Sequence, residues 1–62
     1  MAYYLNNGKK YSVKFERNSI FVTEESPMFD GAFYSVTDVI RLDSMLEVRE
    51  YLKEKNGGID VY

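Results

Sequence analysis

Residues 3–16, YYLNNGKKYSVKFE, contain two apolar segments on either side of Asn7-Gly8. Apolar and polar side chains alternate in the second segment, which is the period of a β-strand with one buried face. Asn and Gly both tolerate the positive φ angles of a two-residue hairpin turn. The stretch therefore predicts an antiparallel hairpin with strands over residues 2–6 and 9–16.

Turn signals and β-branched or aromatic residues predict two further strands after this hairpin. Residues 17–19, Arg-Asn-Ser, offer a turn, and strands are expected over residues 20–23 and 32–36. The segment 24–31 between them holds the only proline and ends in Asp30-Gly31. We expect that segment to be a surface loop.

The second half of the chain contains a helix start at Ser44. Ser44 and Glu47 have the spacing of a capping box, in which each side chain satisfies a free backbone N–H of the first turn. Gly57-Gly58 ends the helix, because glycine accepts the left-handed conformation found there. We also expect a short helical turn over residues 37–40 and a final strand over 59–62. The apolar stripe of the helix consists of Met45, Val48 and Leu52, with Tyr51 on its flank.

In the order β-β-β-β-α-β, these elements predict an α+β fold with a four- to five-stranded, mainly antiparallel sheet and one helix packed on one face. Its 62 residues are expected to form one domain, residues 1–62, at a size where one core gives little stability. Strand alternation directs one set of side chains inward, namely Tyr11, Val13, Phe15, Tyr34 and Val36. It leaves a second set partly exposed, namely Tyr3, Tyr4, Phe21, Phe29, Phe33 and Tyr62.

The composition argues against most enzyme classes. Cys and His are both absent, which removes disulfides, thiolate nucleophiles, the usual general base at neutral pH and the commonest metal ligand. We expect no enzymatic activity, no metal and no cofactor, and a cytoplasmic location. No apolar run reaches the roughly 18 residues of a membrane helix, and residues 1–4 lack the features of a secretory signal.

Paired carboxylates are the remaining source of acid–base or metal chemistry. Each acid nevertheless has an ordinary structural explanation, as a turn residue before glycine, a residue before a helix or the end of a strand. We therefore expect no catalytic pair. The acids considered are Glu24, Glu25, Asp30, Asp38 and Asp43.

Residues 37–55 resemble the closing segment of a known group of proteins. The run TDVIRLDSMLEVREYL, residues 37–52, is similar to the ending of many small proteins from bacteriophages and mobile elements. In those proteins a short turn, a Ser cap and a Glu-rich helix close a small β-sheet, and they commonly act by binding a host protein. The resemblance implies an accessory protein that modulates or inhibits a host enzyme.

Aromatic residues point to a protein-binding surface. Six Tyr and four Phe exceed what one helix can cover, and aromatic side chains are favoured at protein interfaces. We predict a protein partner, with a second copy of the chain, joined through a sheet edge or an aromatic face, as one such partner. The predicted interface residues are Phe21, Phe29, Phe33 and Leu46, with the acids Glu24, Glu25 and Asp30 at the rim.

A nucleic-acid site is the alternative interpretation, because basic and aromatic residues cluster in the first hairpin. The cations are Lys9, Lys10, Lys14 and Arg17. The whole chain carries a net charge of −2, so bulk attraction to nucleic acid is not expected. Within the strand, Tyr11 and Phe15 face away from Lys10 and Lys14, so the aromatic rings cannot stack on bases where the lysines meet phosphates. We rank nucleic-acid binding below protein binding for this reason.

Overall fold

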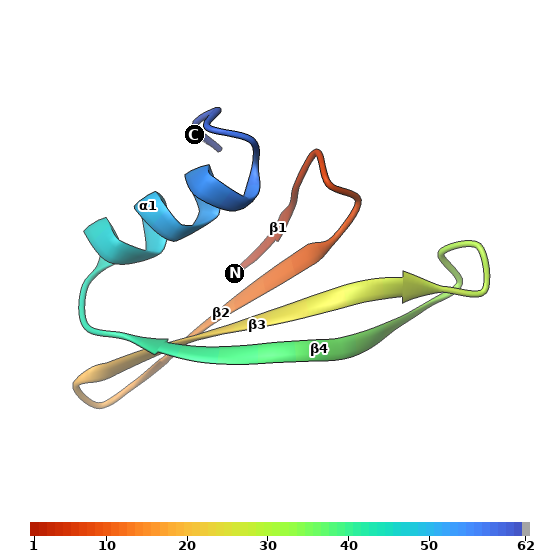
Figure 1. The fold of residues 1–62 in the computed structure, drawn as a ribbon. Coiled ribbons are helices and arrows are strands. Elements are labelled where there is room, and N and C mark those ends of the chain that lie inside the picture. The colour runs from red at the N-terminus through yellow and green to blue at the C-terminus, as the bar shows by residue number, and fades with distance from the viewer. Residues whose placement is uncertain (62) are drawn as a thin grey trace.

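The computed structural model describes residues 1–61, which form four strands followed by one helix. The elements are β1 (Ala2–Tyr4), β2 (Lys10–Glu16), β3 (Ser19–Met28), β4 (Phe33–Leu42) and α1 (Met45–Lys55). The strands make one antiparallel sheet in the order β1-β2-β3-β4. Helix α1 covers one face of the sheet, and the β3–β4 hairpin extends past it (Figure 1). The expected α+β fold is thus confirmed.

The core is a thin layer between α1 and the part of the sheet beneath it. Val48 and Leu52 from the helix are fully buried, as Tyr11 is. Val13 lies directly opposite Val22 in the sheet, so both side chains point to the helix side. Leu5 and Ile20 complete the buried apolar set. Two of the five side chains expected to point inward, Tyr11 and Val13, are therefore buried as predicted.

Phe15 is not buried, although its position on β2 is on the helix side. It lies opposite Ile20 but remains 55% exposed. The pairing of β1 with β2 extends only to Ser12, so the end of β2 is an open edge with no neighbouring strand to cover the ring. The prediction that Phe15 belongs to the core is wrong for this reason.

The third and fourth strands are much longer than expected. Residues 24–28 continue β3, residues 37–42 continue β4, and the connection is confined to residues 29–32. Neither the surface loop over 24–31 nor the helical turn over 37–40 forms. The two segments supply hydrogen-bonding partners for each other's backbone, and pairing between distant segments overrides local propensity.

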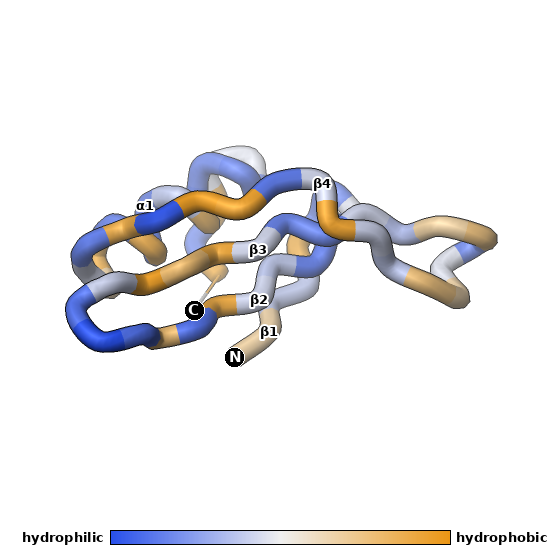
Figure 2. The backbone as a smooth tube through the Cα atoms, turned by 90° about the horizontal axis from the view of Figure 1, so that it is seen from below, coloured by the Kyte–Doolittle hydropathy of each residue, from blue (hydrophilic) through white to orange (hydrophobic). Residues whose placement is uncertain are grey.

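A β-bulge at Thr37 explains two further differences from expectation. Glu24 lies opposite Asp38, whereas Glu25 lies opposite Val36, so Thr37 is an extra residue in β4. One extra residue reverses the alternation of all side chains beyond it. Tyr34 and Val36, expected to point inward, consequently lie on the sheet face away from α1. That face, called the open face below, is uncovered when the molecule is seen from below (Figure 2).

Helix α1 begins after the expected Ser44 cap and ends before Gly57 and Gly58, whose φ angles of +72° and +86° are left-handed as expected. Ser44 Oγ accepts a hydrogen bond from Glu47 N at 3.3 Å, while Glu47 Oε2 accepts from Asp43 N at 2.7 Å. At the other end, Asn56 Oδ1 accepts from Asn6 N at 2.8 Å, which ties the helix to the β1–β2 connection. The cap therefore fixes α1 on the first hairpin.

The strand expected over residues 59–62 does not form over residues 59–61, and Tyr62 lies outside the described residues. Asn56 Nδ2 donates to Ile59 O at 3.0 Å, and Arg49 makes two hydrogen bonds to Asp60, at 3.3 and 3.1 Å. These contacts keep the segment beside the helix rather than at an edge of the sheet. Within residues 1–61, no helix is long and apolar enough to cross a membrane.

The thin core predicts a sharp contrast between neighbouring helix positions. Leu52→Ala should lower the free energy of unfolding by about 2–5 kcal/mol, because it leaves a cavity under α1. Leu46→Ala should change it by less than about 0.5 kcal/mol, because Leu46 is 66% exposed. Urea unfolding followed by circular dichroism measures both variants. Equal losses would show that α1 does not pack through the Val48–Leu52 side.

Candidate protein interface

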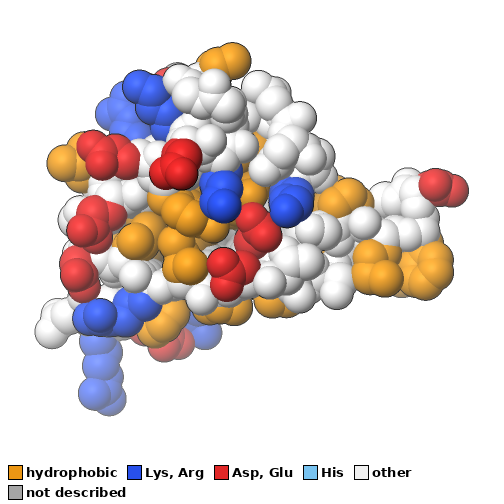
Figure 3. Space-filling view, in the orientation of Figure 1, with side chains coloured by type: hydrophobic (Ala, Val, Ile, Leu, Met, Phe, Trp, Pro, Cys, Tyr) orange, Lys and Arg blue, Asp and Glu red, His pale blue; other side chains and the backbone are white. Residues whose placement is uncertain are grey.

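The end of the β3–β4 hairpin carries three large apolar side chains outside the core. Met28, Phe29 and Phe33 are 45%, 73% and 65% exposed. Met28 and Phe33 lie opposite each other, and the rings of Phe29 and Phe33 meet edge to face with centroids 6.0 Å apart. In the space-filling view, hydrophobic side chains gather at the end of this projecting hairpin (Figure 3). We call Met28, Phe29, Asp30 and Phe33 the distal tip.

The backbone of the distal tip is strained in a way that presents Phe29 to solvent. Phe29 and Asp30 have φ angles of +52° and +58°, in the left-handed region, and Gly31 follows at +87°. Gly31 N donates to Met28 O and Ala32 N to Phe29 O, both at 3.1 Å. A left-handed residue with a side chain costs about 1–2 kcal/mol. Backbone strain of this kind is concentrated at functional sites. At the distal tip the strain is not offset by burial of the Phe29 ring, which stays exposed.

The structure brings together only part of the predicted interface. Phe29, Phe33 and Asp30 all lie at the distal tip. Leu46 is exposed on α1, and Phe21 lies on the open face, so neither belongs to the tip. Met28 completes the cluster but was absent from the predicted set. Its position directly before Phe29 in the sequence could have indicated it.

The two predicted rim acids in β3 are already used within the sheet. Glu25 Oε2 accepts from Ser12 Oγ at 3.0 Å on the open face. Glu24 is buried on the helix side, where its Oε2 accepts from the Tyr11 hydroxyl and its Oε1 from the Thr37 hydroxyl, both at 2.8 Å. The prediction that Glu24 lies at an exposed rim is therefore wrong.

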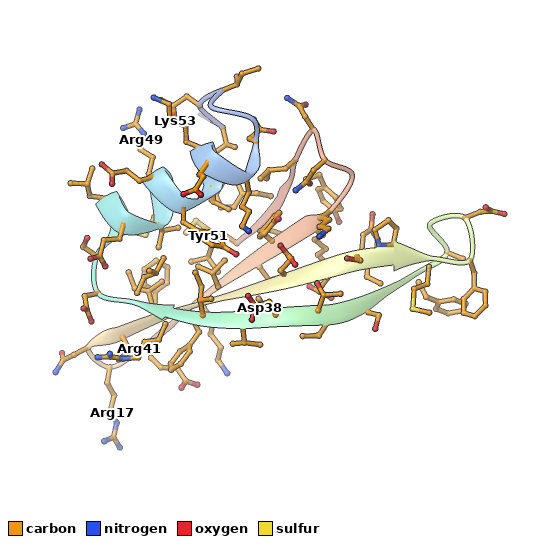
Figure 4. All side chains as sticks on the ribbon, viewed as in Figure 1. Arg17, Asp38, Arg41, Arg49, Tyr51 and Lys53 are labelled. Atoms are coloured by element: carbon orange, nitrogen blue, oxygen red, sulfur yellow. The ribbon has the colours of Figure 1, made fainter. Side chains whose placement is uncertain are left out.

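Hydrogen bonding sets the ionisation of this buried carboxylate. The Tyr11 and Thr37 hydroxyls, aided by Lys9 Nζ at 3.5 Å, hold the pKa of Glu24 below its usual value against the opposing effect of burial. Burial raises the pKa of Tyr51 to about 12, and the nearby Glu24 charge acts in the same direction. Tyr51 lies between α1 and the sheet (Figure 4).

Two of the acids considered as a catalytic pair do lie opposite each other, namely Glu24 and Asp38. Both Glu24 oxygens have donors, as described above. Asp38 Oδ1 accepts the backbone N–H of its own neighbour, Val39, at 2.9 Å. No group of three or more potential metal-ligating side chains occurs among residues 1–61. Within the fold, Glu24 accepts hydrogen bonds at the edge of the core, and Asp38 accepts one from the backbone of β4.

The Asp38 contact bears on association through a sheet edge. Strand β4 is an edge of the sheet, and an unpaired edge N–H is a template for another strand. The Val39 N–H is already bonded to Asp38, and the bulge at Thr37 interrupts the strand next to it. A second copy would have to displace both features, so the middle of β4 is a poor pairing edge.

The four predicted nucleic-acid residues divide between two faces. Lys9 Nζ lies 3.5 Å from the buried Glu24 and belongs to the helix side. Lys10 and Lys14 both point to the open face, and Lys14 is the one nearer the turn that carries Arg17. The aromatic partner of Lys14 on that face is not a residue of the same strand but Phe21, directly opposite on β3.

Comparisons with known proteins give no match to this chain: no family model, no curated protein sequence and no solved structure is significantly similar. The functional argument therefore rests on the exposed surfaces of the fold. Two exposed surfaces have no role in packing the core. They are the distal tip and the basic end of the open face, where Lys14 and Phe21 lie beside the turn that carries Arg17. The tip is the more apolar of the two.

The Glu24 contacts predict how stability depends on pH. Because folding lowers the pKa of Glu24 from about 4.5, its contribution is complete above that pH and is lost as the pH falls through the folded-state pKa. Glu24→Gln should lower the free energy of unfolding by about 1–3 kcal/mol at neutral pH. The difference from the wild type should shrink as the pH falls through the folded-state pKa, because Glu24 then becomes neutral like the glutamine that replaces it.

Urea unfolding at several pH values measures this difference. Glu50→Gln, which removes a carboxylate from the exposed side of α1, controls for the general change in charge. A gap between wild type and Glu24→Gln that stays constant from neutral to acidic pH would contradict the assigned role of Glu24.

Proposed function

We propose that this protein is a small protein-binding module that inserts its distal tip into an apolar pocket or groove of a partner. One observation carries the proposal: Met28, Phe29 and Phe33 form an exposed apolar cluster at the end of a hairpin that the core does not need. Exposed apolar clusters on small proteins mark interaction sites. Deeply inserted aromatic side chains supply most of the binding energy at such sites.

Several features of the hairpin support this use. The tip projects beyond α1, so a partner can surround it on more than one side (Figures 1 and 3). The Phe29 and Phe33 rings contact each other, so less side-chain freedom is lost on binding. Asp30, at the top of the turn, supplies a polar group beside the apolar cluster, as the rim of an interface does.

The identity of the partner is a further part of the proposal. The Ser44 cap and the helix after it, within residues 37–55, resemble the ending of small bacteriophage and mobile-element proteins, although residues 37–42 are a strand and not the short turn of that pattern. This part of the resemblance supports a host enzyme as partner, whose activity the bound module would modulate or inhibit. The absence of Cys supports a cytoplasmic setting. A second copy of the chain is the other candidate, bound through the same apolar tip.

Site-specific photo-crosslinking tests the proposal in the cells that make the protein. A photoreactive phenylalanine at position 29 should give a discrete crosslinked product, because the ring would lie in the partner's pocket. The same group at position 46, which is also mostly exposed but lies on α1, should give none. The mass of the product distinguishes a second copy from a different protein.

A double variant, Phe29→Ser with Phe33→Ser, serves as the loss-of-binding test. It should fold with nearly wild-type stability, because both side chains are mostly exposed, and co-purification of the crosslinked protein should be lost. No product from position 29, or equal products from positions 29 and 46, would exclude the distal tip as the interface.

A further inference from the structure

The open face carries an aromatic side chain between two cations at the end opposite the distal tip. Lys14, Phe21 and Arg41 lie directly across from one another on β2, β3 and β4, so all three side chains point to the same face. Arg41 is held there, because its Nε donates to Ser19 Oγ at 2.8 Å. The sequence of a single strand does not reveal this arrangement, since each of the three residues belongs to a different strand.

The adjoining turn adds a third cation and a hollow. Arg17 follows β2 with a φ angle of +52° and reaches away from α1, with Arg41 near the same end of the sheet (Figure 4). Glu16, Arg17, Ser19 and Phe21 line an open hollow of about 530 Å³. The Phe21 ring is therefore accessible from a concavity that is bordered by a guanidinium group.

A second group, of one cation and two aromatic rings, lies further along the open face. Lys10 Nζ lies 6.0 Å from the ring centroid of Tyr4 and 5.7 Å from that of Tyr34, and the two rings meet edge to face. Lys10 and Lys14 are four residues apart on β2, or roughly 13 Å at the rise of a strand. The Ser12–Thr23 pair lies between them, so the face alternates aromatic and cationic groups with small polar ones.

Charge is distributed unevenly between the two sides of the molecule. The open face and its turn hold four of the eight cations, Lys10, Lys14, Arg17 and Arg41, and three of the ten acids, Glu16, Glu25 and Asp43. The excess there is +1, against −3 for the remainder of the chain. The ion pairs Lys14–Glu16 and Arg41–Asp43 are exposed, and pairs of that kind are weak enough for an anionic ligand to displace.

From this juxtaposition we propose that the open face binds single-stranded nucleic acid, with a base stacked on Phe21 and phosphates contacted by Lys14, Arg17 and Arg41. Single-strand sites combine cations along a groove with aromatic faces that accept any base. Tyr11 and Phe15 face away from Lys10 and Lys14, so those two rings cannot stack on bases beside the lysines. Phe21 can, because it lies on the neighbouring strand between Lys14 and Arg41.

An acidic peptide is the other anionic ligand that these cations could attract, but the aromatic rings favour nucleic acid. A peptide carboxylate would interact with the cations alone. A nucleotide carries a flat base next to each phosphate, so it would contact both the cations and the aromatic rings. Two groups of aromatic and cationic side chains, whose lysines lie roughly 13 Å apart along β2, match the repeating character of a strand of nucleotides better than an isolated charge would. This site is separate from the distal tip, and the two can be tested with different variants.

Fluorescence anisotropy with a labelled oligo(dT) of about ten nucleotides tests the proposal on the full chain. Phe21→Leu keeps apolar volume but removes the stacking surface, and it should weaken binding about tenfold. Arg17→Ala, in an exposed turn, should weaken binding and reduce the slope of log K against log salt by about one, as expected for one lost phosphate contact. Circular dichroism verifies that each variant is folded.

Matched controls make the outcome decisive. Phe15→Ala removes an exposed ring from the other face of β2, and Lys53→Ala removes a cation from α1, so both should bind oligo(dT) like the wild type. Absence of binding at about 50 mM salt, or equal losses in Phe15→Ala and Phe21→Leu, would overturn the proposal. Displacement of oligo(dT) by polyglutamate at an equal concentration of charge would also overturn it, in favour of an acidic protein ligand.

Discussion

A mismatch in length between one helix and two strands determines the form of this molecule. An α-helix of 11 residues is about 16 Å long, whereas a ten-residue strand is about 33 Å long. Helix α1 can therefore cover only half of β3 and β4, and its tie to the β1–β2 connection through Asn56 fixes which half. The longest dimension of the protein is 35 Å, close to the length of one such strand.

The boundary of the core is a polar one. Glu24 lies at the point in β3 where the apolar layer ends, and its two oxygens accept hydrogen bonds from Tyr11 on β2 and Thr37 on β4. The bulge at Thr37 is at the same level of the sheet, and it turns the side chains beyond it to the opposite faces. The hairpin past this level contributes little to packing, so its apolar residues are available for binding. The open face is uncovered for a different reason, since residues 1–61 form only one helix and the sheet has two faces.

Local signals in the sequence predicted the elements that local interactions build. Asn7-Gly8 marked the first hairpin, and Ser44 with Glu47 marked the helix start. The hairpin turn itself differs from expectation, because the connection spans residues 5–9 and only Gly8 of the pair has a positive φ angle. Long-range pairing could not be predicted in the same way: residues 24–28 contain a proline and two glutamates, and they are a strand only because residues 33–38 pair with them. The bulge reversed the expected directions of Tyr34 and Val36 for the same reason. The excess of aromatic residues directed attention to Phe29 and Phe33, which are exposed and in contact with each other. The cations beside Phe21 depend on strand register, which the sequence does not display.

The most direct test of this division between core and projecting hairpin is the free energy of unfolding of a shortened chain. In that variant, residues 27–34 are replaced by Asn-Gly, so that a two-residue turn joins the opposed residues Ser26 and Ser35. If the core ends at Glu24, the shortened protein should unfold cooperatively in urea with a free energy within about 1 kcal/mol of the wild type. Loss of several kcal/mol, or of the cooperative transition, would show that the distal hairpin is part of the folding unit.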